Sequence, residues 1–349
     1  MKILLPISLD RVRSPISTLL RYVAVLLPKH EFTAGSSPVD AIDKNCSDEL
    51  WSHPHIEAKG ILGMITGRYD IVHHASATSK NLAAARFAKL RSLGKSVHIF
   101  TANCEPYSTD PYLRYMELSL KRADVVVAVS EAVAKGVKNY SGRNVDAVIP
   151  NGFDEEFYQL PEVAKNDSAP FFLFCAQLLD RKHPEFFLDL AEMFPDHQFI
   201  MVGNNPYPDS ELAKDSLARI EALPNVVHKG LCSREDVREL MQSATALLFP
   251  SDYEGLPLTV VEAMGCGCPV IAQPRSSLPE VIDHEETGWM YLNSQRDEWV
   301  GRMTALIELS DVDKRDLACK IRASVIDRFS WKFIAKSYGE LYEKLYRAK

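Results

Sequence analysis

Two glutamates, Glu254 and Glu262, stand eight positions apart in the segment PSDYEGLPLTVVEAMGCGCPVIA. A carboxylate accepts several hydrogen bonds, so each of them can hold a pair of neighbouring hydroxyl groups. Pro257 suits the first turn of a helix and predicts that a helix begins near Leu256–Leu258. The backbone N–H groups from Gly255 to Thr259 would then be the unpaired donors of a helix N-terminus, which suits a phosphate. The layout fits a ribose diol and a sugar diol joined by a pyrophosphate.

The same two glutamates have plainer interpretations. A surface glutamate followed by a solvated helix glutamate would carry no chemistry, and the spacing alone would favour that. However, the apolar runs at 246–249 and 269–272 predict strands on either side of the helix, which places Glu254 at a strand's carboxyl end, where ligands bind in parallel sheets. A glycosidase pair needs two carboxyl groups about 5–9.5 Å apart around one bond, and nothing in the segment indicates that arrangement. We therefore expect a ligand site here.

The elements that must position these residues alternate along the whole chain. Short apolar runs, typical of strands buried on both faces, are separated by helix-length segments, and this pattern predicts parallel sheets of the α/β class. The predicted strands are 3–7, 71–73, 97–100, 125–129 and 145–149, and then 171–175, 198–202, 226–228, 246–249, 269–272 and 289–292. Between the two series, residues 155–170 have the composition of a linker.

The length of 349 residues favours two domains. We expect two doubly wound, Rossmann-like domains facing each other across a cleft, the first over residues 1–160 and the second over 161–330. Ligands of such sheets bind beyond the carboxyl ends of the strands, so two facing domains would create one deep site.

The charge is unevenly distributed and excludes one class of partner. Residues 1–165 hold 20 Lys and Arg against 18 Asp and Glu, a balance of +2, whereas residues 166–349 hold 20 against 29, a balance of −9. An acidic half argues against a nucleic-acid partner, which requires a basic surface. Arg11, Arg13 and Arg21 beside an apolar run are compatible with a weak peripheral contact to an anionic membrane. The alternative, solvated helix charges, is the one we favour.

Cysteine usage and the absence of long apolar runs predict a cytoplasmic protein. Seven scattered cysteines, mostly inside apolar segments, are typical of a reducing compartment. Cys266 and Cys268 lack the spacing of a zinc site, so packing is their expected role. No apolar run reaches 18 residues, and the apolar stretch at the N-terminus is too short for a secretory signal.

Glu254 and Glu262 lie in a longer series of motifs that resembles a known family. SDYEGLPLTVVEAMGCGCPVIA followed by SSLPEVIDHEETGWMY looks like the donor-binding signature of the family 4 retaining glycosyltransferases, which have the two-Rossmann GT-B fold. The similarity extends to further segments: ADVVVAVSEAVAKGV at 123–137, VIPNGFDEEFY at 148–158, VGNN at 202–205, VVHKGLCSREDVRELMQSATALLFPS at 226–251, and RFSW at 328–331. The resemblance also implies that the C-terminal helix, 331–349, packs back on the first domain.

The resemblance implies roles for matched positions. Glu254 would meet the donor sugar, Lys182 would neutralise the leaving diphosphate, and Asn103 takes the place where the family often has a catalytic histidine. Independently of the family, a metal-free enzyme that releases a diphosphate needs a cation aimed at the developing charge. No metal or other cofactor is expected, because the nucleotide sugar is a co-substrate.

The other implied contacts surround the donor. Glu262 would bind the nucleotide ribose, backbone near two residues of a later loop would contact the base, and the backbone of the helix start would meet the donor sugar and diphosphate. These donor-binding residues are Glu262, Gly255, Leu256, Leu258, Thr259, Gln177, Arg181, Leu231 and Cys232.

Departures from the family pattern concern both halves of the chain. Where the family usually has an arginine before Lys182, this chain has Gln177, and either Arg181 substitutes for it or Gln177 donates only weaker neutral hydrogen bonds. The first loop, SLDRVRSP at 8–15, lacks the usual paired glycines. His73 and His74 end a strand and are interpreted equally well as acceptor contacts or as packed neutral side chains.

The function that follows is transfer of a sugar, of the hexosyltransferase type, from a nucleoside-diphosphate sugar to a hydroxyl of a glycan, a lipid-linked molecule or a small molecule. Retention of the anomeric configuration is expected. Two alternatives remain open at this point: a non-catalytic protein that binds sugar nucleotides or glycans, and a sugar-nucleotide epimerase of the same fold.

Overall fold

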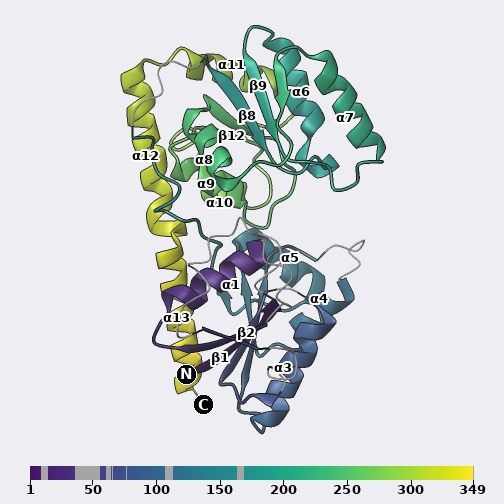
Figure 1. The fold of residues 1–349 in the computed structure, drawn as a ribbon, viewed down its shortest axis with the longest axis vertical. Helices are drawn as coiled ribbons and strands as arrows, with labels where there is room; N and C mark the ends of the chain where they lie inside the picture. Colours follow the sequence, from purple (N-terminus) through teal and green to yellow (C-terminus); the bar gives the residue numbers. More distant parts are fainter. Residues whose placement is uncertain are drawn as a thin grey trace. The chain divides into compact units, whose positions relative to one another are not determined.

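The computed structural model describes residues 1–8, 15–35, 56–59, 64, 66–75, 77–106, 113–162 and 169–348. They form two compact units, Met1–Gly152 with Trp331–Lys349, and Phe153–Ser330 (Figure 1). The inferences drawn from the loop at 8–15, with Arg11 and Arg13, fall almost wholly outside the described residues.

The first unit ends before the predicted boundary at residue 160. Phe153 already bridges to Ser330, and its N–H donates to the carbonyl of Phe329 over 2.8 Å. The Arg322 guanidinium donates to the carbonyls of Glu155 and Tyr158. These contacts hold the start of the segment expected as linker against the second unit.

The first unit contains a parallel sheet in the order β3-β2-β1-β4-β5-β6-β7. Its strands are β1 Lys2–Ser8, β2 Glu31–Gly35, β3 Ile56–Lys59, β4 Ile71–His74, β5 Val97–Ala102, β6 Val125–Ala128 and β7 Ala147–Val148. Its helices are α1 Pro15–Leu26, α3 Ser79–Arg91, α4 Leu113–Arg122, α5 Glu131–Ser141 and α13 Trp331–Arg347. The order of the first six strands is that of a Rossmann fold.

The second unit repeats this plan with the parallel order β10-β9-β8-β11-β12-β13. Its strands are β8 Phe171–Cys175, β9 Gln198–Val202, β10 Val226–His228, β11 Ala246–Phe249, β12 Val270–Ala272 and β13 Trp289–Met290. Its helices are the 3₁₀ helix η3 Asp180–Lys182, α6 Pro184–Met193, α7 Glu211–Ala222, α8 Arg234–Ser243, α9 Leu258–Gly265, α10 Leu278–Val281, α11 Arg296–Ile307 and α12 Asp311–Phe329. The predicted fold class, two doubly wound α/β domains, is confirmed.

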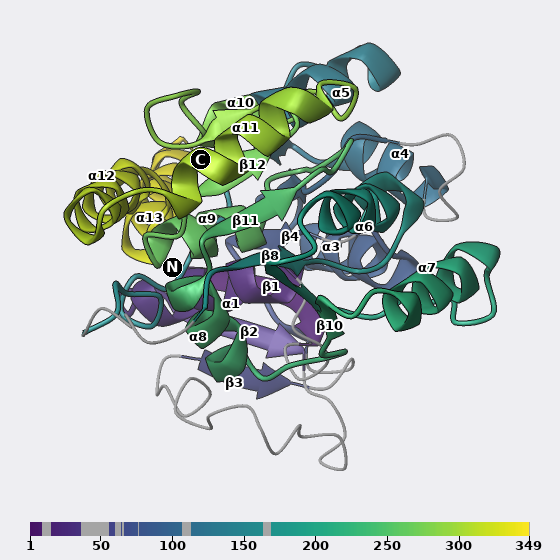
Figure 2. The ribbon, with the colours of Figure 1, turned by 90° about the horizontal axis from the view of Figure 1, so that it is seen from above.

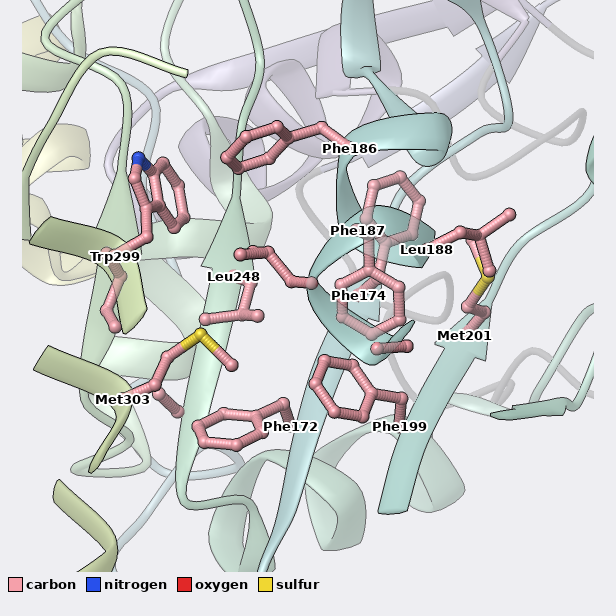
Figure 3. Packing of buried hydrophobic residues seen from close by; sticks show 14 of the residues in the cluster. Phe172, Phe174, Phe186, Phe187, Leu188, Phe199, Met201, Leu248, Trp299 and Met303 are labelled. Atoms are coloured by element: carbon pink, nitrogen blue, oxygen red, sulfur yellow. The ribbon is translucent and has the colours of Figure 1, made fainter. Parts of the chain in front are cut away.

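The sheet of the second unit is fixed by an aromatic core on one face. Figure 3 shows Phe172 and Phe174 of β8 and Phe199 of β9 in one cluster with Phe187 of α6 and Trp299 of α11. On the other face, α12 runs beside α9 (Figure 2). Burial on both faces explains why these strands read as continuous apolar runs.

The last helix, α13, belongs to the first unit and packs against α1, as expected for the C-terminal helix. The Tyr22 and Trp331 rings stack with their centroids 4.8 Å apart. Deeper in the core, the Tyr342 hydroxyl lies 2.6 Å from His73 Nδ1, and His73 Nε2 lies 2.8 Å from the Thr101 hydroxyl. Burial lowers the pKa of His73 to about 3, so the imidazole is neutral. This network fixes α13 on β4 and β5.

The Tyr342→Phe substitution is expected to lower the free energy of unfolding by about 1–3 kcal/mol, because it leaves the buried His73 Nδ1 without its partner. Denaturant unfolding followed by circular dichroism measures this change. Tyr346→Phe, at an exposed position of the same helix, is the control and should change stability by less than about 0.5 kcal/mol. Equal stabilities of the two variants would contradict the network.

None of the helices that the structure describes combines the length and apolar character required to span a membrane.

Candidate functional site

The candidate site lies where the strand order of the second unit reverses. β8 and β11 are neighbours at the centre of the sheet. The chain after β8 runs through α6 to β9 on one side of this pair, whereas the chain after β11 runs through α9 to β12 on the other side. In open α/β sheets this switch point is where ligands bind, outside the carboxyl ends of the strands. The loop 176–183 follows β8 and the loop 250–257 follows β11, so the topology brings both predicted donor segments together.

The two loops meet through a buried ion pair. The Lys182 ammonium contacts Glu254 Oε1, and their side chains are only 10% and 11% exposed. Lys182 Nζ also lies 5.1 Å from the centroid of the Phe249 ring. Burial lowers the pKa of Lys182, and the Glu254 carboxylate opposes that shift. A fixed, partly desolvated cation beside a carboxylate is suited to a ligand that carries both negative charge and hydroxyl groups.

Serines hold Glu254 from both sides. The Ser251 hydroxyl donates to Glu254 Oε1 over 2.7 Å. The hydroxyls of Ser276 and Ser277 donate to the Glu254 carbonyl over 2.6 and 3.2 Å. The two serines come from the segment SSLPEV after β12, so a third loop fixes the backbone of the carboxylate. The orientation of Glu254 is therefore set by contacts within the protein.

The N-terminus of α9 follows directly after Glu254. Ser210 and Ser233 cap the starts of α7 and α8 with their side chains. The start of α9, at the N-cap residue Pro257, has no side-chain cap, as is also the case for α6, α10 and α11. The helix starts at Leu258, as the sequence predicts. Of the predicted backbone donors, Leu256 is buried, whereas Gly255, Leu258 and Thr259 are half-buried. An uncapped helix start at a strand's carboxyl end is suited to a phosphate.

Glu262 lies half-buried on the second turn of α9. The hydroxyl of Tyr158 is hydrogen-bonded to it, and Arg234 Nε donates to the same hydroxyl over 3.4 Å. Arg234 is itself held by Asp154, with Nη2 3.2 Å from Oδ2. Burial raises the pKa of Tyr158, and the nearby Glu262 carboxylate adds to the shift. Tyr158 thus stays a neutral donor that orients Glu262.

The remaining residues predicted to contact the donor are more exposed to solvent than Lys182 and Glu254. Gln177 is exposed after β8, and Arg181 uses Nη1 to donate to the carbonyl of Tyr253 over 3.1 Å. Leu231 is 79% exposed, and Leu231 and Cys232 line a cavity of about 620 Å³ with Lys229 and residues of α8. The cavity is large enough to take a planar group beside the exposed Leu231.

Gly203 lies at the end of β9 next to the loop after β8. A Cβ atom at this position would stand 2.0 Å from the carbonyl oxygen of Ala176, and its φ of +121° is unfavourable for any other residue. The glycine therefore permits the close approach of two strand ends beside Gln177.

Asn103 lies in the first unit, after β5. Its side-chain amide donates to the carbonyls of Ala75 and Thr101 over 2.8 and 3.2 Å, and its Oδ1 is buried with no partner among the described residues. His73 and His74 are both buried. His74 Nε2 lies 2.7 Å from His98 Nε2. His73 and His74 are therefore packed in the core of the first unit, which favours their interpretation as packed side chains over that as acceptor contacts.

The cysteines of the described residues are free. Cys266 and Cys268 are buried, and burial raises the pKa of both thiols, that of Cys268 to about 12. They pack as small apolar side chains, as expected. Within the described ranges, no group of three or more His, Cys, Asp or Glu side chains is placed to hold a metal ion.

Comparison with known proteins relates both units to one class of enzyme. Residues 158–323 match the model of glycosyl transferases group 1, and residues 32–157 match that of glycosyltransferase family 4. Most of the chain is therefore covered by two successive family models.

Curated relatives and a solved structure agree with these matches. The chain is 25% identical over 251 residues to alpha-maltose-1-phosphate synthase of Mycolicibacterium smegmatis, covering 65% of each chain. It is 24% identical over 281 residues to UDP-Gal:alpha-D-GlcNAc-diphosphoundecaprenol alpha-1,3-galactosyltransferase of Escherichia coli, covering 74% of this chain and 66% of the relative. It thus spans just under two thirds of the length of both.

Anabaena Alr3699/HepE, solved in complex with UDP-glucose, has a similar fold. Its TM-score is 0.78 at 21% identity, over 99% of this chain and 100% of the other. At this identity the likeness concerns the fold.

Proposed function

Because the chain belongs to the family 4 glycosyltransferases, we propose that it transfers a sugar from a nucleoside diphosphate to an acceptor hydroxyl and retains the anomeric configuration. The observation that carries the donor assignment is the buried contact between Lys182 and Glu254 at the switch point of β8 and β11, beside the uncapped start of α9.

Each part of the site has one task in this proposal. The Lys182 ammonium neutralises the diphosphate as the bond to the sugar breaks, and the backbone N–H groups at the start of α9 bind the phosphate oxygens. Glu254 accepts hydrogen bonds from the sugar hydroxyls, and Glu262 accepts them from the ribose. Leu231 and Cys232 flank the base.

The mechanism relies on positioning and on stabilisation of charge. The described residues of the site include no side chain that is plainly placed to attack the sugar as a nucleophile. We propose that the acceptor hydroxyl approaches on the face from which the diphosphate leaves, and that a phosphate oxygen takes its proton. Because the acceptor then bonds to the anomeric carbon on the face that the diphosphate leaves, the anomeric configuration is retained. Lys182 supplies the cation, so we propose that the reaction needs no metal.

The printed names of similar proteins suggest the partners. The Anabaena structure holds UDP-glucose, and the Escherichia coli relative is named for a diphosphoundecaprenol acceptor. We therefore place a uridine nucleotide first among candidate donors, and a lipid-linked glycan first among candidate acceptors. A cytoplasmic location, with weak peripheral contact to the membrane, would give access to both.

Incubation with a panel of nucleotide sugars and acceptors, with and without EDTA, tests the proposal. We expect acceptor-dependent release of nucleoside diphosphate that EDTA leaves unchanged, and NMR of the product should show the anomeric configuration of the donor. Inversion, or loss of turnover with EDTA, would contradict the mechanism. Tight binding without turnover across the panel would contradict catalysis itself.

A further inference from the structure

We propose that protonated His183 is a positioning residue that clamps the Lys182 loop to the Glu254 loop, so that donor binding weakens as His183 loses its proton. The inference rests on the proposed function for its link to the donor. His183 follows Lys182 directly and forms the junction between η3 and α6.

The geometry of the imidazole supports this role. His183 Nδ1 lies 2.6 Å from Glu185 Oε1, and His183 Nε2 lies 2.6 Å from Asp252 Oδ2. A carboxylate only accepts hydrogen bonds, and both ring nitrogens donate only in the imidazolium form. The two contacts together therefore require the protonated ring. In the neutral ring, one nitrogen would face a carboxylate with a lone pair, and that contact would be lost.

The backbone of His183 is adapted to this position. Its φ of 52° and ψ of 54° lie in the left-handed region, which non-glycine residues adopt uncommonly and which histidine, asparagine and aspartate tolerate better than most. A glycine or asparagine would make the same turn between η3 and α6 without titrating near neutral pH. The sequence instead has the side chain whose charge changes in that range.

His183 bridges two loops that are already joined at the residues just before it in the chain. The N–H of Asp252 donates to the carbonyl of Arg181 over 2.9 Å, and the Ser251 hydroxyl oxygen lies 3.2 Å from the same carbonyl. The Asp252 carboxylate is fixed from the other side by Gln273 Nε2, 3.1 Å from Oδ1. Loss of the bond between His183 and Asp252 would free one side of this pairing. The contact between Lys182 and Glu254 is close to this bond, because Lys182 is the neighbour of His183 on one loop and Glu254 lies two residues after Asp252 on the other.

The charges that face His183 come from three elements: α6, the loop after β11, and η3. Glu185 on α6 and Asp252 on the β11 loop are the acidic groups in contact with it, whereas Lys182 and Arg181 precede it in the chain. Around the carboxylates, Arg275 lies near Asp252, and Arg219 of α7 donates to the carbonyl of Glu185 over 3.3 Å.

The balance of these groups sets the pH window. Burial would lower the pKa of His183, but the bonds to Asp252 and Glu185 outweigh it and raise the pKa above 6.5. Burial would raise the pKa of Asp252, but the bond from His183 outweighs it and lowers the pKa below 3.8. The clamp is therefore fully formed at mildly acidic pH and is lost as pH rises through the raised pKa of His183.

The first test measures the clamp without any ligand. NMR titration of the whole protein should give His183 a pKa above 6.5, and Asp252→Asn should lower it. Hydrogen exchange at the Asp252 amide should be faster in His183→Asn than in the wild type at the same mildly acidic pH. His197→Asn, which replaces a half-buried histidine elsewhere in the same unit, is the control and should leave that amide unchanged. A pKa of His183 at or below 6.5 would overturn the inference.

The second test measures binding of UDP-glucose by calorimetry between about pH 6 and about pH 8.5, where histidine titrates. The diphosphate diester of UDP-glucose keeps its charge in this pH range, so a change in affinity reports on the protein. We expect wild-type affinity to fall about two- to fivefold as pH rises, and His183→Asn to bind weakly at every pH. An unchanged pH profile in His183→Asn would overturn the inference.

Lys182→Met, measured in parallel, separates the two claims. If Lys182→Met binds UDP-glucose as tightly as the wild type, the assignment of Lys182 to the donor diphosphate fails. If the wild type does not bind UDP-glucose, UDP-glucose is not the donor. The titration and the exchange of the Asp252 amide then still decide whether His183 clamps the loops. If Lys182→Met binds weakly while His183→Asn behaves as the wild type, the donor site stands and the clamp does not.

Discussion

Replacing Lys182 by Met is expected to lower kcat by a factor of about 10² to 10³, the usual cost of removing one preorganised group that stabilises charge in the transition state. The ammonium is held by Glu254 in a nearly buried position, so it does not have to reorganise as the diphosphate leaves. The rate of nucleoside diphosphate release at saturating donor measures this effect. Lys320→Met, which removes an exposed ion pair with Glu286, is the matched control and should keep full activity.

Loss of Lys182 also leaves Glu254 as a nearly buried charge without its partner, and that can destabilise the fold. The double variant Lys182→Met with Glu254→Gln removes both charges, so its folding can be compared by thermal unfolding. If the double variant is folded and turns over at the rate of the wild type, Lys182 does not stabilise the leaving group.

Replacing Glu262 by Ala is expected to weaken the binding of the nucleotide by about 10- to 100-fold, because hydrogen bonds to a charged group contribute about 1.5–3 kcal/mol. The ribose is remote from the reacting carbon, so the loss should appear mainly in KM, with kcat changed less. Calorimetric titration with UDP and steady-state kinetics measure the two effects separately.

Two further variants sharpen this second prediction. Tyr158→Phe removes the hydroxyl that orients Glu262 and should weaken binding less than Glu262→Ala does. Glu308→Ala, at an exposed position at the end of α11, should bind as the wild type does. A Glu262→Ala protein with wild-type affinity would remove Glu262 from the donor site.

The second unit was the easier half to predict from sequence. β8, β9, β10 and β11 have the predicted bounds, because each is a short, mostly apolar run between clear helices. In the first unit, β2 and β3 were not predicted. The sequences EFTAG and IEAK contain too few apolar residues to be distinguished from loops, and they pair at one side of the sheet, where the neighbouring strands stabilise them.

The site could be predicted only in part. The segment from Glu254 to Glu262 is local in sequence, so its spacing and its proline indicated a loop followed by a helix. The contact of Lys182 with Glu254 joins residues 72 positions apart, and only the family resemblance placed Lys182 near the donor. Tyr158 and His183 were missed, because their roles depend on partners in other loops. The tyrosine in VIPNGFDEEFY, a segment already matched to the family, was the one available signal.

The most direct test of the donor site is a crystal structure of the protein with an intact nucleotide sugar. We expect the diphosphate to lie between Lys182 Nζ and the backbone N–H groups at the start of α9, with the ribose diol on Glu262 and the sugar against Glu254. A donor bound elsewhere, or one whose diphosphate lies away from Lys182, would contradict the assignment on which the proposed function rests.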